Sequence, residues 1–226
     1  MCGRFLNRIP ASETARLFRT TNPLPNYEPL YNIAPTNDVP VVRFRADAGT
    51  RSLDLLRWGL VPFWAKDMKI GASLINAAAE TVAQKPAFRE AFASRRCIVP
   101  ADGFYEWQKL GPKEKQPFAI VMKDRSLFGF AGLWERWRDK ASGAVVRSFT
   151  IITTTPNEVC APIHNRMPVI LDPASYGRWL GDEAVEPDQL LALLKPYPAA
   201  LMAAYKVGQA VGNVKNIDAS VADPLA

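Results

Sequence analysis

The sequence predicts an α+β fold in which curved, mainly antiparallel β-sheets form a barrel-like core with helices at its flanks. Its 226 residues, 48% of them hydrophobic, lie at the upper end of the size of a single domain and can bury a sizeable core. About eight strand-like runs are interspersed with helical segments, without a regular βαβ alternation. No internal repeat or Gly/Ser-rich linker divides the chain. Residues 1–226 are therefore expected to form one domain.

The strands follow a helix and a loop in the first part of the chain. Residues 12–18 predict a short helix, with Ser12 as its N-cap after Pro10. Residues 22–38 are rich in proline and asparagine and predict a long loop. Runs rich in β-branched and aromatic residues then predict strands over 39–45, 53–58, 96–99, 103–107, 118–122, 127–134, 145–153 and 167–171.

Helices are expected at three later places, over 80–93, 173–180 and 187–195. Pro86 interrupts the first of these, and a proline inside a helix removes a hydrogen bond and clashes with the preceding turn. We therefore expect the segment to end or kink at Pro86, unless this residue lies in the opening turn of the later half.

Residue usage narrows the class of protein. Cysteines at 2, 97 and 160 are too few and too scattered for a disulfide framework, which indicates a reducing cytoplasm. His164 is the single histidine, so a metal site is not expected. No run approaches the roughly 20 apolar residues of a membrane-spanning helix. The first ten residues carry charges where a signal peptide has its apolar core, so secretion is not expected.

Charge is unevenly distributed along the chain. Residues 1–171 hold 24 Lys and Arg against 15 Asp and Glu, whereas residues 172–226 hold 4 against 7. A basic body suits a polyanionic partner such as nucleic acid, because each neutralised phosphate releases counterions. Many basic soluble proteins bind no nucleic acid, so charge alone leaves both interpretations open.

Cys2 stands directly after the first methionine. A residue this small allows methionine aminopeptidase to remove Met1, which would leave an α-amine and a thiol on adjacent carbons. The amine has an ordinary pKa of about 7.7 to 8.0, so a neutral, nucleophilic fraction exists at pH 7. This amine can attack an aldehyde to give a Schiff base, and the thiol can then close a five-membered thiazolidine ring. The alternative is an incidental cysteine near a frayed terminus.

Three polar residues are candidates for acid–base chemistry or positioning. Glu106 lies among aromatic residues on a predicted strand, where burial would raise its pKa and make it a general acid; the alternative is a carboxylate facing water. His164 has the only side chain with an ordinary pKa close to neutral, and it could equally be structural. Asn76 follows an apolar run and could orient a substrate or cap the next helix.

Two adjacent aromatic residues, Phe63 and Trp64, lie in a proline-containing loop and are followed by Lys66 and Lys69. Aromatic rings beside cations suit single-stranded nucleic acid, because bases stack on rings while ammonium groups follow phosphates. The alternative is an apolar plug over the core.

Seven motifs occur in an order that resembles the SOS response-associated peptidase family, whose members shield abasic sites in single-stranded DNA. The resemblance covers about residues 1–216, and the ordered set is far more specific than any single motif. The motifs are Met1–Phe5, Tyr31–Pro35, Arg57–Pro62, Ile75–Thr81, Arg96–Trp107, Ile163–Pro168 and Val211–Asn216.

The resemblance implies a cytoplasmic, monomeric protein that forms a covalent thiazolidine crosslink between its mature N-terminal cysteine and the aldehyde of an abasic site. It would associate with the nucleoid when it acts on DNA, and it needs no cofactor. By the same resemblance Cys2 is the nucleophile, Asn76 positions the sugar, Glu106 transfers protons and His164 is a second acid–base group. The implied DNA contacts are Arg4, Phe63, Trp64, Thr153 and Arg166.

One position departs from the family pattern. Relatives often carry an arginine two residues after the motif asparagine, and this chain has Ala78. A phosphate contact is therefore missing or comes from elsewhere, with Lys85 and Arg89 as candidates.

Three other functions remain open. The family name records a cysteine peptidase, to which self-catalysed removal of Met1 would belong. A glutaminase with an N-terminal nucleophile also begins Met-Cys-Gly, but the arginine- and glycine-rich substrate motifs of that class are not found. The third is a passive single-strand binding module without chemistry.

Overall fold

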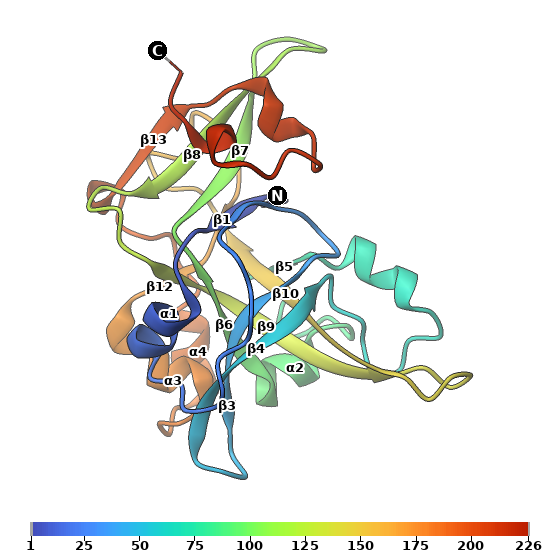
Figure 1. The fold of residues 1–226 in the computed structure, drawn as a ribbon. Helices are drawn as coiled ribbons and strands as arrows, with labels where there is room; N and C mark the ends of the chain where they lie inside the picture. Colours follow the sequence, from blue (N-terminus) through green and yellow to red (C-terminus); the bar gives the residue numbers. More distant parts are fainter. Residues whose placement is uncertain (1, 226) are drawn as a thin grey trace.

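The computed structural model describes residues 2–225, which form two β-sheets with short helices around them (Figure 1). The smaller sheet, at the top of Figure 1, has the strand order β13-β8-β7-β1-β2, and each neighbouring pair in it is antiparallel. Its strands are β1 (Phe5–Asn7), β2 (Leu30–Ile33), β7 (Gly103–Lys109), β8 (Lys115–Met122) and β13 (Met202–Lys206). The strand β1, close to the start of the chain, therefore lies inside a sheet, between β2 and β7.

The larger sheet closes into a five-stranded barrel. Around the ring, β10 pairs with β4, β4 with β3, β3 with β6, β6 with β9, and β9 returns to β10. The β10–β4 pair is parallel and the other four are antiparallel. The ring consists of β3 (Asp38–Arg45), β4 (Thr50–Trp58), β6 (Arg96–Ala101), β9 (Phe128–Arg138) and β10 (Val145–Thr154). The predicted α+β class with a barrel-like core is confirmed.

Three short strands extend the barrel at one end, and two of them flank β10. They are β5 (Asn76–Ala78), parallel to β10, β11 (Met167–Pro168), antiparallel to β10, and β12 (Ile170–Leu171), antiparallel to β9. The C-terminal end of β10 thus lies between β5 and β11, and this arrangement brings together residues that are far apart in the sequence.

Helices are short and lie mostly beside the barrel (Figure 1). The α-helices are α1 (Ala11–Phe18), α2 (Arg89–Ser94), α3 (Tyr176–Leu180) and α4 (Pro187–Ala192). The 3-10 helices are η1 (Met68–Ser73), η2 (Pro173–Ser175), η3 (Ala199–Leu201), η4 (Gln209–Gly212) and η5 (Ala219–Ala222). Within residues 2–225, none of the helices has the length and apolar character needed to cross a membrane.

One apolar cluster joins the two sheets. Phe5 of β1 packs edge-on against Trp58 of β4 at 5.1 Å between ring centroids, and against Phe130 of β9 at 5.8 Å. All three side chains are buried, as is Phe104 of β7, whose ring meets Phe130 at 5.9 Å. Because aromatic pairs add to the burial of their apolar area, this cluster fixes the smaller sheet on the barrel.

Several predicted elements differ from those in the structure. The N-cap of α1 is Pro10, and no side chain caps this helix, so Ser12 does not fill that role. The predicted loop over 22–38 contains β2. The predicted strand over 167–171 is divided into β11 and β12 because the Val169 N–H donates to the carbonyl of Ile152. The short strands β1, β5 and β13 were not predicted.

The region predicted as a helix over 80–93 is mostly turns, and only α2 at its end is helical. The carbonyl of Lys85 accepts hydrogen bonds from the N–H groups of Phe88 and Arg89, both at 2.9 Å. Pro86 therefore lies in the opening turn before α2, where a missing N–H carries no cost. Asn76 does not cap a helix, because it is the first residue of β5.

Candidate functional site

Cys2 and Glu106 come together because the β1–β7 pairing continues beyond β1. Phe5 is opposite Phe104 in antiparallel register, and the carbonyl of Arg4 accepts a hydrogen bond from the Tyr105 N–H at 2.9 Å. Residues 2–4 therefore run alongside 105–107. Cys2 is fully buried, and only 4% of Glu106 is exposed. Met1 lies outside the described residues, so its predicted removal is not addressed by the structure.

Burial dominates the electrostatics of this pair. It raises the pKa of the Glu106 carboxyl to about 7, since a carboxylate among aromatic and aliphatic side chains loses its hydration. It also raises the pKa of the Cys2 thiol, and the negative charge of Glu106 raises it further. Near neutral pH, Glu106 is thus present in both its protonated and its ionised form, while Cys2 remains a thiol.

Cys160 is a third member of this buried group, and no motif or spacing in the sequence singles it out. Its pKa is raised to about 12, first by burial and then by the charge of Glu106. Its backbone begins the turn that carries His164: the Cys160 N–H donates to Asn157 Oδ1 at 3.0 Å, and its carbonyl accepts the His164 N–H at 2.9 Å. The turn therefore places His164 on the same side of the molecule as Cys2 and Glu106.

His164 lies in a loop that leads into β11, as its sequence context indicates. Its Nδ1 accepts the backbone N–H of Arg166 at 3.1 Å, which is compatible with a neutral ring protonated on Nε2. Partial burial lowers the pKa of His164, so the ring is mostly neutral at pH 7 and can accept a proton. In residues 2–225, no three side chains among His, Cys, Asp and Glu are grouped closely enough to hold a metal ion.

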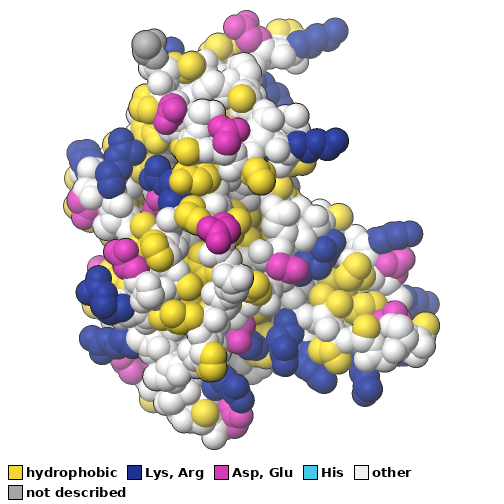
Figure 2. Space-filling view, viewed as in Figure 1, with side chains coloured by type: hydrophobic (Ala, Val, Ile, Leu, Met, Phe, Trp, Pro, Cys, Tyr) yellow, Lys and Arg dark blue, Asp and Glu magenta, His cyan; other side chains and the backbone are white. Residues whose placement is uncertain are grey.

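A surface groove, here called the Trp64 groove, collects five of the residues proposed from the sequence. It encloses about 610 Å³ and lies over β5 and the end of β10. Figure 2 shows that the outline of the molecule is indented between the upper sheet and the part that carries η1. The groove is lined by Trp64, Ser73, Leu74, Asn76, Ala78, Lys85, Pro86, Ala87, Phe88, Thr153 and Arg166.

Arg166 is fixed at the wall of this groove by Glu80. Its two terminal nitrogens donate to the two carboxylate oxygens of Glu80 at 2.6 and 2.9 Å, and one of them also donates to the Thr153 carbonyl at 2.7 Å. A bidentate pair of this kind is directional. Glu80 belongs to the motif over 75–81. The sequence does not identify it as the partner of Arg166, which lies 86 positions further along the chain.

Asn76 reaches the groove from β5, which is parallel to β10 and pairs with Ile151–Thr153. Its Nδ2 donates to the adjacent Ile75 carbonyl at 3.0 Å. Its Oδ1 is buried and has no hydrogen-bond partner among the described residues. Buried amide oxygens are nearly always bonded, so this atom is an acceptor available to a ligand.

Phe63 and Trp64 are 50% and 49% exposed, respectively. Neither ring belongs to any of the apolar clusters of the core. Trp64 lines the groove, whereas Phe63 lies outside its lining. The exposure of both rings disfavours the interpretation of this loop as a plug over the core.

Arg4 does not reach the Trp64 groove. It is buried, and one terminal nitrogen donates to Asn32 Oδ1 at 2.8 Å and to the Val211 carbonyl at 2.6 Å. Asn32 Nδ2 in turn donates to the Asn216 carbonyl at 2.7 Å. Arg4 and Asn32 thus tie the N-terminal strands to the segment 211–216, and a role of Arg4 in DNA binding stays a prediction.

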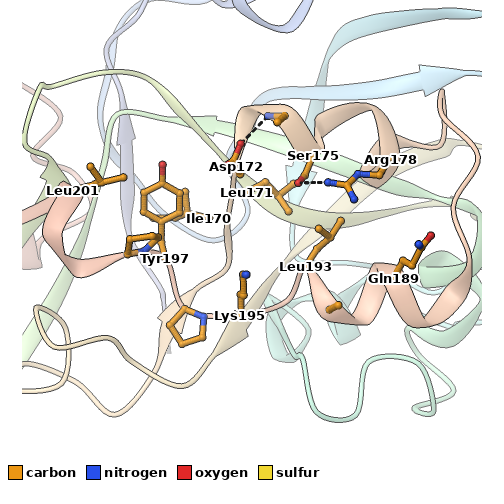
Figure 3. Close-up of a pocket in the computed structure, with 14 residues that line it drawn as sticks. Ile170, Leu171, Asp172, Ser175, Arg178, Gln189, Leu193, Lys195, Tyr197 and Leu201 are labelled. Carbon is orange, nitrogen blue, oxygen red and sulfur yellow. Dashed lines mark hydrogen bonds between the residues drawn. The ribbon is translucent and has the colours of Figure 1, made fainter.

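A second cavity, of about 520 Å³, lies beside η2, α3 and α4 (Figure 3). It holds none of the residues proposed from the sequence. Asp172 at its edge accepts the Ala174 N–H, and Arg178 donates to Ser175 Oγ at 3.1 Å, so these polar groups are engaged within the protein. Lys195 also lines it and provides a lysine outside the proposed site.

The chain resembles known proteins in sequence and in fold. Residues 1–214 match the family described as SOS response associated peptidase (SRAP), and the chain belongs to this family. The abasic site processing protein YoqW of Bacillus subtilis is 45% identical over 218 residues, which is 96% of each chain. The abasic site processing protein HMCES of Pongo abelii is 30% identical over 96% of this chain and 74% of its own length.

Solved structures show the same fold. A protein from Bacteroides thetaiotaomicron aligns over 100% of both chains, with a TM-score of 0.89 and 27% sequence identity. A protein from Bordetella bronchiseptica aligns over 92% of this chain and all of its own, with a TM-score of 0.77 and 27% identity.

The raised pKa of Glu106 predicts a pH-dependent stability. A carboxyl whose pKa is higher in the folded than in the unfolded state stabilises the fold below the unfolded value, and this contribution is lost as pH rises through about 7. Glu106→Gln removes the titration. We expect Glu106→Gln to be more stable relative to wild type at pH 8 than at pH 5, with a difference in the free energy of unfolding that is larger by roughly 2 to 3 kcal/mol in urea denaturation.

Glu80→Gln is the control, because the bond to Arg166 lowers the pKa of Glu80. It should give no gain in stability at pH 8. Equal effects of Glu106→Gln at the two pH values would contradict the raised pKa of this carboxyl.

Proposed function

We propose that this protein binds single-stranded DNA at abasic sites and, once Met1 is removed, joins its N-terminal cysteine to the lesion through a thiazolidine ring. The observation that carries the proposal is the buried Glu106 beside Cys2, with a pKa of about 7 that suits proton transfer in both directions. The relatives YoqW and HMCES, both called abasic site processing proteins, support the same lesion as the target.

The chemistry needs a nucleophile, an acid and a second nucleophile on the adjacent carbon. The neutral α-amine of Cys2 attacks the aldehyde carbon of the ring-opened sugar and forms a carbinolamine. Protonation of its hydroxyl expels water and leaves an iminium ion. The Cys2 sulfur then adds to the iminium carbon as the thiol gives up its proton to a base, which closes the neutral ring and restores the proton used in the first step. The net reaction releases one water and requires no oxidant.

Glu106 is the proposed acid of the dehydration step. At pH 7 about half of its carboxyl groups are protonated, so it can donate a proton to the departing hydroxyl. Its ionised form can then accept the proton of the thiol, since an iminium beside Cys2 counteracts the effects that raise the pKa of that thiol. His164, mostly neutral at pH 7, is the proposed base for opening the sugar or reversing the ring.

The Trp64 groove is the proposed path of the single strand. Trp64 offers an exposed indole for stacking on a base, Asn76 offers an unbonded acceptor, and Arg166 faces the same space. Lys85 lines this groove together with Ala78, whereas Arg89 does not. Of the two candidates for the phosphate contact missing at Ala78, the groove therefore favours Lys85.

The environment of Cys2 favours this chemistry over peptidase activity. A cysteine peptidase uses a thiolate whose pKa is lowered by a nearby cation. At Cys2 both burial and Glu106 act in the opposite direction. A passive binding module would not require a carboxyl with a pKa near 7 beside the N-terminal thiol.

Cys2→Ser is expected to lose the durable adduct and to keep most of its affinity for single strands. The serine amine can still form an imine, but its hydroxyl closes a less stable ring. The measurement is a denaturing gel of protein mixed with abasic DNA, in which wild type gives a heat-stable shifted band. Intact mass shows beforehand whether Met1 is removed. Durable adduct from Cys2→Ser at the wild-type level, or from protein with a blocked amine, would rule out the mechanism.

Glu106→Gln should form the adduct more slowly at every pH while its DNA affinity stays nearly unchanged, because the amide keeps the shape but exchanges no proton. Wild type should lose rate on the acid side as the α-amine becomes protonated. His164→Ala should slow sugar opening or ring reversal without abolishing the product. Single-turnover rates against pH test these expectations, and equal rates for Glu106→Gln and wild type would remove Glu106 from the chemistry.

Trp64→Ala should weaken binding of single strands by about 1 to 3 kcal/mol, the usual contribution of one base stacked on an aromatic ring. Its melting temperature should stay close to that of wild type, because the ring is half exposed. Fluorescence anisotropy and thermal melting of the same variant separate the two effects. A lower melting temperature with unchanged affinity would assign the ring to the fold.

A further inference from the structure

A second groove lies on the other side of the segment that carries His164. This hairpin groove, of about 340 Å³, lies between the β7 residues 107–109 and the loop 161–165. One short segment contributes to both grooves, because His164 and Asn165 line the hairpin groove and Arg166 lines the Trp64 groove. Two residues proposed for chemistry are thus divided between the grooves: Asn76 lines the Trp64 groove and His164 lines the hairpin groove.

The hairpin groove has the side chains that suit a nucleic-acid strand. Trp107, Gln108 and Lys109 of β7 all line it. The indole of Trp107 packs on the buried Arg4, whose guanidinium carbon lies 5.8 Å from the ring centroid. Gln108 Nε2 donates to the Pro162 carbonyl at 3.0 Å and ties the two walls together. An aromatic residue and a lysine thus line a groove whose two walls are joined by a hydrogen bond.

The tip of the β7–β8 hairpin carries positive charge that the protein does not neutralise. Lys109 is directly opposite Lys115 in the antiparallel ladder, and like charges in this position destabilise a hairpin. Lys113 lies in the turn between them, where Glu114 is the single acidic residue. In the described part of the chain, none of these lysines forms a salt bridge. Figure 2 shows dark blue side chains projecting at the top right, where the hairpin ends in Figure 1.

We infer that the hairpin groove is a second binding surface for single-stranded DNA, which takes the nucleotides on the side of the abasic site opposite to those in the Trp64 groove. Lys109 and Lys115 would neutralise phosphates there and Trp107 would contact a base. The repulsion between the two lysines is relieved when an anionic backbone lies across them. This inference rests on the proposed function and adds the course of the strand over the 164–166 segment.

Binding of oligonucleotides that carry a tetrahydrofuran abasic analogue tests the inference, because this analogue has no aldehyde and reports non-covalent affinity alone. One oligonucleotide has nucleotides on both sides of the analogue, one only on its 5′ side and one only on its 3′ side. In the double variant Lys109→Ala/Lys115→Ala, the slope of log affinity against log salt should fall by about 1.4 for the two-sided oligonucleotide, or about 0.7 per phosphate contact. The same loss should appear with one of the one-sided oligonucleotides and be absent with the other.

Two matched variants sharpen the result. Lys85→Ala, in the Trp64 groove, should show its loss with the opposite one-sided oligonucleotide. Lys195→Ala, in the cavity of Figure 3, should change none of the slopes. The inference would be overturned if the double variant at Lys109 and Lys115 kept the wild-type salt slopes. It would also be overturned if this variant and Lys85→Ala lost slope with the same one-sided oligonucleotide.

A charge reversal separates binding from folding. Lys115→Glu places opposite charges in the cross-strand pair, so the melting temperature should be equal to or higher than that of wild type while affinity falls. A fall in both melting temperature and affinity would assign the lysines to the stability of the fold and contradict the inference.

Abasic DNA with an aldehyde gives an independent readout. If wild type forms the adduct and the hairpin variants bind normally, the inference alone fails. If wild type forms no adduct and binds no single strand, the proposed function fails as well.

Discussion

The arrangement of the site depends on the strand pairing of β1 with β7. A chain terminus usually frays, yet β1 lies between two strands of a sheet, and its Phe5 is buried against the barrel. Arg4 and Asn32 hold the same region to the segment 211–216 by hydrogen bonds at 2.6 to 2.8 Å. These contacts give Cys2 a fixed position beside Glu106. An N-terminal nucleophile can be placed accurately only if the residues that follow it are anchored in this way.

The same burial that raises the pKa of Glu106 weakens the fold around it. A carboxyl with a pKa of about 7 is ionised in about half of the molecules at neutral pH, in a place where ionisation is unfavourable. A glutamine of nearly the same shape would avoid this cost. Proteins commonly accept such a loss where a side chain must change its protonation state during function. The salt bridge between Arg8 and Asp102, at 2.6 Å and close to β7, shows a carboxylate in the same sheet that keeps a cationic partner.

The parts of the fold that the sequence could predict are the longer strands. Runs rich in β-branched and aromatic residues identify β3, β4, β6, β9 and β10, because these strands bury several side chains in succession in the barrel. The strands β1, β5 and β13 have three to five residues and are too short to show such a run. Asn76 is misplaced because the alanines after it have high helix propensity, whereas parallel pairing with β10 determines their conformation. Burial of Glu106 could be expected from its aromatic neighbours, but its contact with the N-terminal residues depends on strand register.

Register also explains why partners in the site are distant in sequence. Thr153 is opposite Ala78 on one side of β10 and opposite Pro168 on the other, so this single residue aligns β5 with the segment that follows His164. Its carbonyl accepts both the Ala79 N–H at 2.9 Å and a guanidinium nitrogen of Arg166 at 2.7 Å. Glu80, the next residue after this contact, completes the bidentate pair with Arg166. The guanidinium of Arg166, which faces the Trp64 groove, is therefore positioned by main-chain pairing in the barrel. A change in the register of β10 would displace both walls of the groove together.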